Sequence, residues 1–342
     1  MRHVNIPIFI PHLGCPNQCV FCNQRSISGV RDFDPESVRN IIDNALETTT
    51  DDDEVEIAFF GGSFTGIDQD LMIDLLSIGH SYIERGLVSS LRCSTRPDYI
   101  NREIVEILKR YGMTTIELGL QSTSNKVLKM SKRGHYFEAE RSACKIITDA
   151  GLNLIGQMMI GLPGSDIESE LETARFIINA GAREARIYPT VVFRDTELCS
   201  LMESEAYVPL SLDDAVQRSA KVLELFVNAG VDVIRIGLQA SEGLSSDETY
   251  VAGPNHPALG ELVIGEYYFN KICERLESEN FDPDSHITIQ VSLGSLSKAI
   301  GQNRINKNRL NAKYKNLVFA ESDGLSAFEI SVTTRNGEIK CI

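Results

Sequence analysis

Three cysteines near the N-terminus are spaced as ligands of one metal centre. Cys15, Cys19 and Cys22 form the pattern C-x3-C-x2-C. The chain has 8 Cys among 342 residues, and random placement would produce this pattern only about 0.004 times. Three thiolates on one short loop can hold zinc or an iron–sulfur cluster. A closed zinc site needs a fourth ligand, and His12 is the nearest candidate; a cluster held by three cysteines leaves one iron able to bind another molecule.

The remaining five cysteines are dispersed and form no second C-x2-C pair. They are Cys93, Cys144, Cys199, Cys273 and Cys341. We expect them to behave as small apolar residues of the core, because an isolated cysteine is most often buried.

Apolar runs of strand length alternate with helical patterns along the first 230 residues. The expected strands are 6–10, 55–60, 91–94, 115–118, 154–160 and 185–188, with 231–236 as a further candidate. Repeated strand–helix units predict an α/β fold with parallel strands covered by helices. Glycine and polar residues follow several strands, which favours a site at the C-terminal mouth of a barrel.

The alternation weakens after about residue 240. We therefore expect a main domain over residues 1–240 and a small α+β extension over residues 241–342. Apolar content is 42% and charged content 24%, as in ordinary globular proteins.

The formal net charge of −15 argues against a surface that coats DNA or anionic lipid. No apolar run reaches the length of a membrane span, and the N-terminal residues lack a signal-peptide pattern. We expect a cytoplasmic protein, because grouped thiols in a reducing compartment indicate metal binding or catalysis rather than disulfides.

The cysteine pattern, placed after the first expected strand, resembles the signature of the radical S-adenosylmethionine (radical SAM) superfamily. Further segments follow in order over residues 5–240 and resemble the radical SAM domain of the catalytic subunit of Elongator and its bacterial and archaeal relatives. They are Phe60-Gly61-Gly62-Ser63-Phe64, Ser94-Thr95-Arg96-Pro97-Asp98-Tyr99, Leu118-Gly119-Leu120-Gln121-Ser122, Lys132-Arg133-Gly134-His135 and Tyr188-Pro189-Thr190.

The resemblance implies a partial (β/α)6 TIM-like barrel. It also implies that Cys15, Cys19 and Cys22 bind three irons of a 4Fe–4S cluster, whose fourth iron is chelated by SAM. An electron from a reductant such as flavodoxin or ferredoxin would cleave SAM to a 5′-deoxyadenosyl radical that abstracts hydrogen from the substrate.

Other site residues are carried over from the same resemblance. Gln121 and Arg133 correspond to positions that hold SAM through its ribose and carboxylate, and the planar fork of an arginine suits a carboxylate. The remaining expected SAM-binding residues are Gly61, Gly62, Ser63, Ser94 and Tyr188. Met158 and Met159 are expected in the core rather than at the cofactor.

Two departures from the family pattern affect the expected function. Ser94 stands where relatives usually have glutamate, so an acidic contact near the ligand is expected to be missing. The roughly 100 residues after the barrel are too few for the acetyltransferase domain of the Elongator subunit, by the usual size of a domain. Acetyl transfer to tRNA is therefore not expected of these residues.

The C-terminal extension contains a basic segment without acidic residues over 286–320. Its cations could contact an RNA backbone, or they could balance the acidic barrel as a solvated face. They are Lys298, Arg304, Lys307, Arg309, Lys313 and Lys315.

The sequence thus predicts a radical SAM enzyme, with tRNA modification as the favoured role. Two alternatives stay open. One is a radical SAM enzyme that acts on a small metabolite or porphyrin, as coproporphyrinogen oxidases do. The other is a zinc-stabilised RNA-binding module without catalysis.

Overall fold

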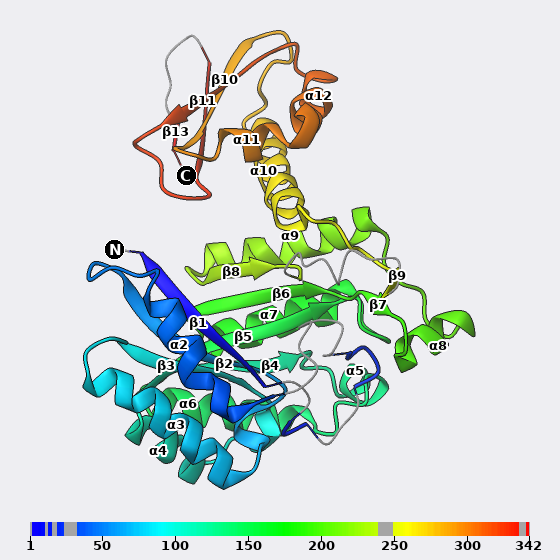
Figure 1. Cartoon of the computed structure of the whole chain (residues 1–342). Helices are drawn as coiled ribbons and strands as arrows, with labels where there is room; N and C mark the ends of the chain where they lie inside the picture. Colours follow the sequence, from blue (N-terminus) through cyan, green and yellow to red (C-terminus); the bar gives the residue numbers. More distant parts are fainter. Residues whose placement is uncertain are drawn as a thin grey trace.

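Seven parallel strands form one curled sheet, shown in Figure 1 as a half-barrel. The computed structural model describes residues 2–10, 13–15, 19–23, 33–238, 249–334 and 340–341. The strands follow the chain from one edge to the other, in the order β1 (His3–Ile10), β2 (Glu54–Gly61), β3 (Ser90–Thr95), β4 (Met113–Gln121), β5 (Asn153–Ile160), β6 (Glu184–Pro189) and β8 (Asp232–Ile236). The expected α/β partial barrel is confirmed, and the candidate strand at 231–236 is its seventh member.

Helices connect the strands and cover the outer face of the sheet (Figure 1). The covering helices are α2 (Val38–Leu46), α3 (Gln69–Glu84), α4 (Arg102–Arg110), α6 (Phe137–Asp149), α7 (Ile167–Asn179) and α9 (Leu212–Asn228). Polar caps fix several helix starts; the side chain of Asp166, for example, accepts a hydrogen bond from the backbone of Ser169. Such a cap satisfies one of the backbone N–H groups that the first turn leaves free.

Alternate residues of each strand face the helices or the barrel interior. In β1, Ile6, Ile8 and Ile10 are buried under the helices, whereas Asn5 and Phe9 point the other way. The outward residues supply the apolar core, and the inward ones are free to carry polar side chains.

Shorter elements cluster near the C-terminal ends of the strands. Helix α5 (Asn125–Met130) follows β4, and α8 (Glu197–Glu203) follows β7 (Val192–Phe193). Strand β7 pairs with β9 (Tyr250–Ala252) in a small two-stranded sheet. These elements carry the loops that border the site described below.

A long helix, α10 (Leu259–Ser278), joins the barrel to a C-terminal domain. It packs on α9 at one end and contacts the sheet of the C-terminal domain at the other. That sheet has four strands in the order β11-β10-β12-β13. The elements of that domain are β10 (His286–Ser292), α11 (Leu296–Ile300), α12 (Ile305–Asn311), β11 (Asn316–Ser322), β12 (Ile330–Thr334) and β13 (Lys340–Cys341). Strand β11 begins within the basic segment, where no strand was expected, and ends just beyond it.

Within the described residues, no helix combines the length and apolar character that crossing a membrane requires.

Candidate functional site

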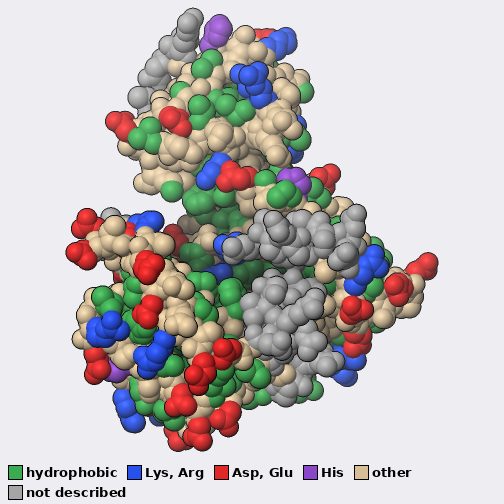
Figure 2. Space-filling view, in the orientation of Figure 1, with side chains coloured by type: hydrophobic (Ala, Val, Ile, Leu, Met, Phe, Trp, Pro, Cys, Tyr) green, Lys and Arg blue, Asp and Glu red, His purple; other side chains and the backbone are tan. Residues whose placement is uncertain are grey.

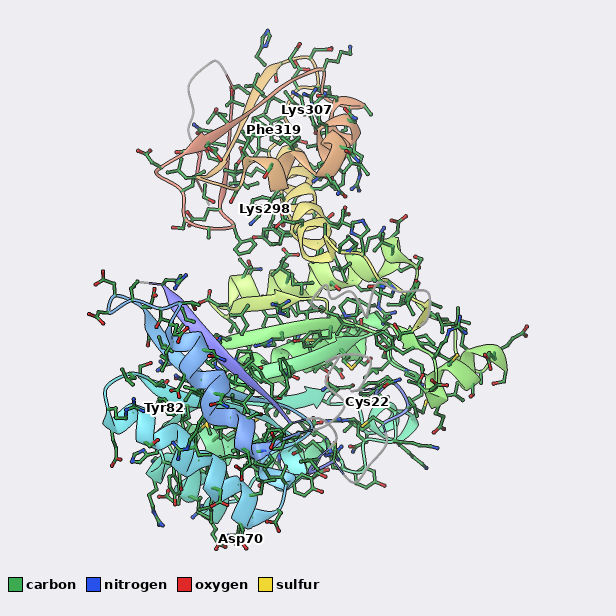
Figure 3. The ribbon with its side chains drawn as sticks, in the orientation of Figure 1. Cys22, Asp70, Tyr82, Lys298, Lys307 and Phe319 are labelled. Atoms are coloured by element: carbon green, nitrogen blue, oxygen red, sulfur yellow. The ribbon has the colours of Figure 1, made fainter. Side chains whose placement is uncertain are left out.

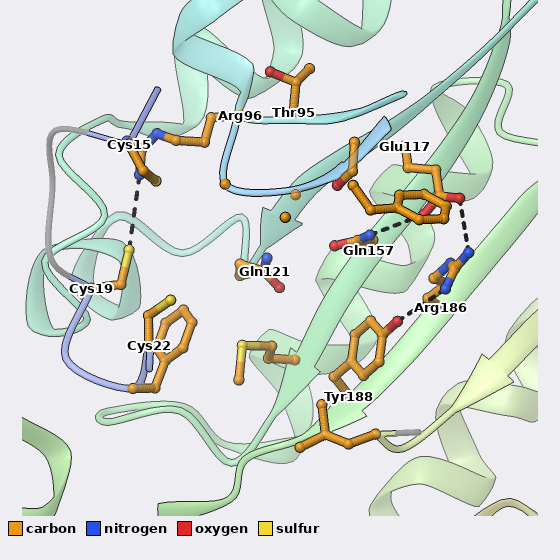
Figure 4. A pocket seen from close by; sticks show the side chains of 18 of the residues that line it. Cys15, Cys19, Cys22, Thr95, Arg96, Glu117, Gln121, Gln157, Arg186 and Tyr188 are labelled. Atoms are coloured by element: carbon orange, nitrogen blue, oxygen red, sulfur yellow. Dashed lines mark hydrogen bonds and ion pairs between the residues drawn. The ribbon is translucent and has the colours of Figure 1, made fainter. Parts of the chain in front are cut away.

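A cavity of about 700 Å³ lies at the C-terminal ends of the barrel strands, within the size range of small-molecule sites. Its lining includes all three cysteines of the motif and residues from every strand of the half-barrel. Figure 2 shows this face hollowed between the barrel and the C-terminal domain, with Lys or Arg side chains inside the hollow. In Figure 4 the cysteines occupy one side of the cavity, and Glu117, Gln157 and Arg186 occupy the other.

Close backbone packing positions Cys15. The preceding residue, Gly14, has a φ of +72°, and a Cβ atom there would lie 2.3 Å from the carbonyl oxygen of Ser63. Only glycine tolerates both the left-handed backbone and this approach. The amide of Ser63 in turn donates a hydrogen bond to the carbonyl of Leu13, so the first part of the motif is tied to the turn after β2.

The second half of the motif is tied to two other elements. The amide of Val20 bonds the carbonyl of Ser131 after α5, and the amide of Leu198 at α8 bonds the carbonyl of Val20. A turn brings the amide of Cys22 within 3.0 Å of the carbonyl of Cys19. Val20 is buried with Leu198 in a small separate apolar cluster, which stabilises the loop against the barrel.

Two arginines direct N–H groups at the sulfur of Cys19. Arg133 Nη1 is 3.3 Å and Arg96 Nη1 is 3.9 Å from Cys19 Sγ. Burial raises the pKa of the nearby Cys15 thiol, and the charges of Arg96 and Arg133 offset this rise only in part. Positive charge next to buried thiols favours thiolates, which are the form that binds metal.

A buried network holds Arg96 in place. Its guanidinium donates two hydrogen bonds of 2.9 Å to Asp98 and one to the carbonyl of Arg133. His135 also contacts Asp98, and its Nε2 lies 3.1 Å from Glu140 Oε1. Burial opposes the charge of Asp98, but hydrogen bonds from His135 and Arg96 hold the pKa of Asp98 well below its ordinary value.

Gln121 and Arg133 converge over β4 and present unsatisfied polar atoms. A Cβ at Gly119 would lie 3.2 Å from Gln121 Nε2 and 3.6 Å from Arg133 Nη2, so glycine leaves room for both side chains. Gln121 Oε1 and Arg133 Nε are buried without hydrogen-bond partners among the described residues. A buried polar atom without a partner is costly, and both side chains line the cavity.

The glycine turn at the end of β2 lines the cavity. Its first glycine, Gly61, is also required by a close contact with β1. Gly61 has a φ of +119°, and a Cβ there would lie 2.5 Å from the carbonyl oxygen of Ile10. Its neighbour Gly62 donates a hydrogen bond to that same oxygen. Close approach to β1, rather than to a ligand alone, therefore requires glycine at position 61.

The remaining expected SAM-binding residues lie in different places. Ser94 and Tyr188 line the cavity. Ser63 is only 1% exposed and lies outside the cavity lining, where its hydroxyl bonds Thr95 and accepts a hydrogen bond from the amide of Arg96. Ser63 therefore positions β3 and Arg96.

Two further expectations concern the methionines of β5 and the candidate zinc ligand His12. Met158 is buried in the core, but Met159 lines the cavity, so the expectation that both lie in the core is wrong for Met159. The alternation of the strand turns the two neighbours to opposite faces. His12, the candidate fourth zinc ligand, lies outside the described residues.

Sequence reasoning missed a charged ladder inside the barrel. Arg92 bridges Glu56 at 2.6 Å and Glu117 at 3.2 Å, and Arg186 reaches Glu117 at 2.8 Å. Gln157 also donates to Glu117 (Figure 4). The available signal was a charged residue inside an otherwise apolar run, as at Arg92 and Glu117, because such a residue is expensive to bury unless it is paired.

The basic segment of the C-terminal domain lies away from the cavity: Figure 3 places Lys298 and Lys307 in that domain and Cys22 in the barrel. Four of its six cations form ion pairs with acidic residues of α10 or of the turn that follows it. The pairs are Lys298–Glu261, Arg309–Glu266, Lys313–Glu277 and Lys315–Asp284. These pairs offset much of the positive charge that the sequence shows locally.

The residues fit a cluster and a polar ligand by their chemistry. Three thiols line one end of the cavity, arginines face them, and two buried polar atoms have no hydrogen-bond partner in the described part of the chain. In the described parts of the chain, no three Cys, His, Asp or Glu side chains are gathered closely enough to hold a metal ion. Thiolate sites are commonly completed by the metal itself, because metal binding and local folding are coupled.

Comparisons with known proteins relate the chain to one superfamily. Residues 9–177 match the Radical SAM superfamily, and residues 183–268 match the Radical_SAM C-terminal domain. Elongator complex protein 3 of Homo sapiens is 28% identical over 296 residues, which are 74% of this chain and 53% of that protein. The tRNA uridine(34) acetyltransferase of Methanocaldococcus infernus is 32% identical over 131 residues, 37% of this chain and 24% of that protein.

A solved structure shares the fold. The archaeal Methanocaldococcus infernus Elp3 with an N-terminal deletion has a TM-score of 0.60 and 21% identity, covering 82% of this chain and 64% of that one. This chain spans about half the length of the human relative.

Proposed function

This chain belongs to the radical SAM superfamily of enzymes, and on that premise we propose that it cleaves SAM reductively at a 4Fe–4S cluster to modify RNA, with tRNA as the substrate. The observation that carries the proposal is the cavity itself. It combines the three motif cysteines with two buried polar atoms, Gln121 Oε1 and Arg133 Nε, that lack partners among the described residues.

Cys15, Cys19 and Cys22 would hold the cluster, and the cavity residues beside them would hold SAM. When bound, these groups supply the electron and the adenosyl radical that removes a hydrogen atom from the substrate. The SAM-facing residues in this proposal are Gly61, Gly62, Ser94, Gln121, Arg133 and Tyr188, all of which line the cavity.

The chain's own residues prepare the cavity for that chemistry. Arg96 and Arg133 stabilise negative charge on Cys19 through their N–H groups. Phe21, Phe60 and Phe193 contribute apolar walls, which limit the access of water to reactive species.

We propose RNA as the substrate because of the relatives that this chain resembles. The human and archaeal proteins are named for Elongator and for the modification of tRNA uridine, and this chain covers only part of each. A ferredoxin- or flavodoxin-type reductant and a cytoplasmic location belong to the same proposal. We also propose that the basic segment contacts the RNA. Arg304 and Lys307 are its two cations that form no ion pair with described residues.

The decisive measurement is the formation of 5′-deoxyadenosine by anaerobically reconstituted protein, with SAM and a chemical reductant, in the presence and absence of total tRNA. We expect formation that rises with tRNA. A Cys19→Ala protein should lose it, whereas Cys273→Ala, which removes a half-buried thiol on α10, should retain it.

Other outcomes would change the proposal. Formation that is indifferent to tRNA would keep the radical chemistry and point to a small-molecule substrate. About one zinc per chain, with neither iron nor sulfide after anaerobic purification, would contradict the radical chemistry itself.

A further inference from the structure

Two arginines lie side by side on neighbouring strands at the end of the cavity opposite the cysteines. Arg186 of β6 and Arg235 of β8 are register partners in the parallel sheet, and both line the cavity. Register partners on adjacent strands point to the same face, so their side chains share one space. Like charges in such a pair destabilise the sheet unless something neutralises them.

Among the described residues, a carboxylate pairs with only one of these two arginines. Arg186 donates to Glu117 at 2.8 Å and to the Tyr188 hydroxyl at 3.3 Å, but its Nε is buried without a partner among the described residues. Glu117 is already shared with Arg92. Arg92 has Glu56 as a second partner, so Glu56 and Glu117 together serve Arg92 and Arg186, and neither pairs with Arg235.

Arg235 has no hydrogen bond or ion pair with any described residue. The other acid on the same face of β6, Glu184, does not line the cavity. Arg235 is half-buried, so bulk water screens its charge only in part.

The cavity lining contains more arginines than carboxylates. Among the described residues, Arg96, Arg133, Arg186 and Arg235 line the cavity, against the single carboxylate of Glu117. Arg96 and Arg133 are turned to Cys19 at the SAM end, and Figure 4 shows Arg186 on the far side of Gln121 from the cysteines. Asp98 pairs with Arg96, so the positive charge that has neither a described carboxylate nor a motif cysteine as a partner lies at the far end, at Arg235 beside Arg186. In a chain of net charge −15, such a charge inside a cavity indicates an anionic ligand.

We propose that Arg186 and Arg235 form a subsite for a singly charged oxyanion of the substrate, either a phosphodiester or a carboxylate. Arginine pairs with both groups through two parallel hydrogen bonds. The subsite deepens the proposed function and rests on it: in an RNA substrate the anion is a phosphodiester beside the modified nucleotide, and in a small metabolite it is a carboxylate. The fixed anion would hold the substrate facing the SAM end of the cavity.

The test measures binding to the reconstituted holoenzyme with SAM at constant ionic strength, by calorimetry. The probes are the dinucleotide UpU, which has one phosphodiester, its uncharged counterpart uridine, and acetate. We expect at least tenfold weaker binding of the anionic probe by Arg235→Gln, a smaller loss by Arg235→Lys, and no change by Arg141→Gln. The last variant removes an exposed arginine of α6 outside the cavity.

Each result has one meaning. Tighter binding of UpU than of uridine, lost in Arg235→Gln, supports the subsite with a phosphodiester; binding of acetate alone, lost in the same variant, supports it with a carboxylate. Equal affinities of the wild type and both Arg235 variants, or no binding of either anion by the wild type, would overturn it. Formation of 5′-deoxyadenosine by the wild type is measured separately, so a failure of the proposed function is distinguished from a failure of the subsite.

Discussion

At the scale of single residues, the site is built by close packing of backbone before any ligand is present. Gly61 illustrates this. Its φ of +119° and the 2.5 Å approach to the Ile10 carbonyl exclude every other residue without a shift of β1. The motif loop begins just after Ile10, so a shift there would move Cys15.

We predict that Gly61→Ala lowers the free energy of unfolding by about 3 kcal/mol, because it adds both left-handed strain and overlap with backbone. Gly86→Ala is the matched control. Gly86 also has a positive φ, of +69°, but a Cβ there meets nothing within 4 Å, so its cost should be about 1 kcal/mol. Urea unfolding of the two variants measures the difference, and equal costs would show that the contact with Ile10 is unimportant.

A second residue-scale prediction concerns Glu140, which is 0% exposed and bonded to His135. Burial raises the pKa of Glu140 from 4.5 to about 7. The folded state then retains a proton that the unfolded state releases, so this contribution to stability is complete below about pH 4.5 and is lost as pH rises through about 7. The pKa of His135 is also raised, because hydrogen bonds to Asp98 and Glu140 outweigh burial, and its contribution is lost in the same direction.

The free energy of unfolding should therefore fall between pH 5 and pH 8, by on the order of 2 kcal/mol. Glu140→Gln keeps a hydrogen-bonding group and should flatten this dependence, whereas Glu138→Gln, on an exposed position of the same helix, should leave it as in the wild type. Urea unfolding at four pH values gives the slopes. A slope that is unchanged in Glu140→Gln would remove that carboxyl as its source.

At the scale of elements, the strands of the barrel were predictable because their outward faces are apolar. The expected strand at residues 6–10 lies within β1, and the candidate at 231–236 coincides with β8 to within one residue. The inward faces were not predictable to the same degree. Glu117 and Arg186 interrupt apolar runs 69 positions apart. They lie on β4 and β6, which β5 separates, so only the folded sheet shows that they pair across its inner face.

Strand β11 was missed for a related physical reason. It alternates between apolar and exposed residues at the surface of the small sheet, with Val318 55% exposed, and it follows a stretch rich in Lys and Asn. Such a stretch is typical of a solvated helix or loop. Parallel pairing with β10 decides its conformation, and this partner is distant in sequence.

The basic segment around α12 yields an element-scale prediction. Because four of its cations are paired with acids of its own domain, we expect Arg304 and Lys307 to make most of any contact with tRNA. A double Arg304→Glu, Lys307→Glu variant should bind total tRNA about tenfold more weakly and with a smaller salt dependence.

The matched control changes the same number of charges elsewhere: Arg141→Glu with Lys221→Glu, both exposed on barrel helices. Filter binding over a range of salt concentrations measures both variants. Equal affinities would assign these cations to the solvated surface and leave RNA binding, if present, to the cavity.

At the scale of the whole molecule, one apolar core extends from the barrel into the C-terminal domain. Leu223 of α9, Val263 and Ile272 of α10, and Ile289 of β10 belong to the same buried cluster. A core shared across α10 makes the two sheets one cooperative unit, because loss of packing at one end exposes apolar surface along the helix.

Ile289→Ala tests this coupling. Ile289 is 0% exposed, so truncation should cost about 2–4 kcal/mol through lost burial and the cavity that remains. If the unit is cooperative, hydrogen exchange followed by mass spectrometry will show faster opening in the barrel strands as well as in β10, by similar free energies. Val318→Ala, at an exposed position of β11, should change the exchange rates neither in the barrel strands nor in β10. Faster exchange confined to residues beyond α10 would instead show a C-terminal domain that opens independently of the barrel, and the substrate cavity would then be stabilised by the barrel alone.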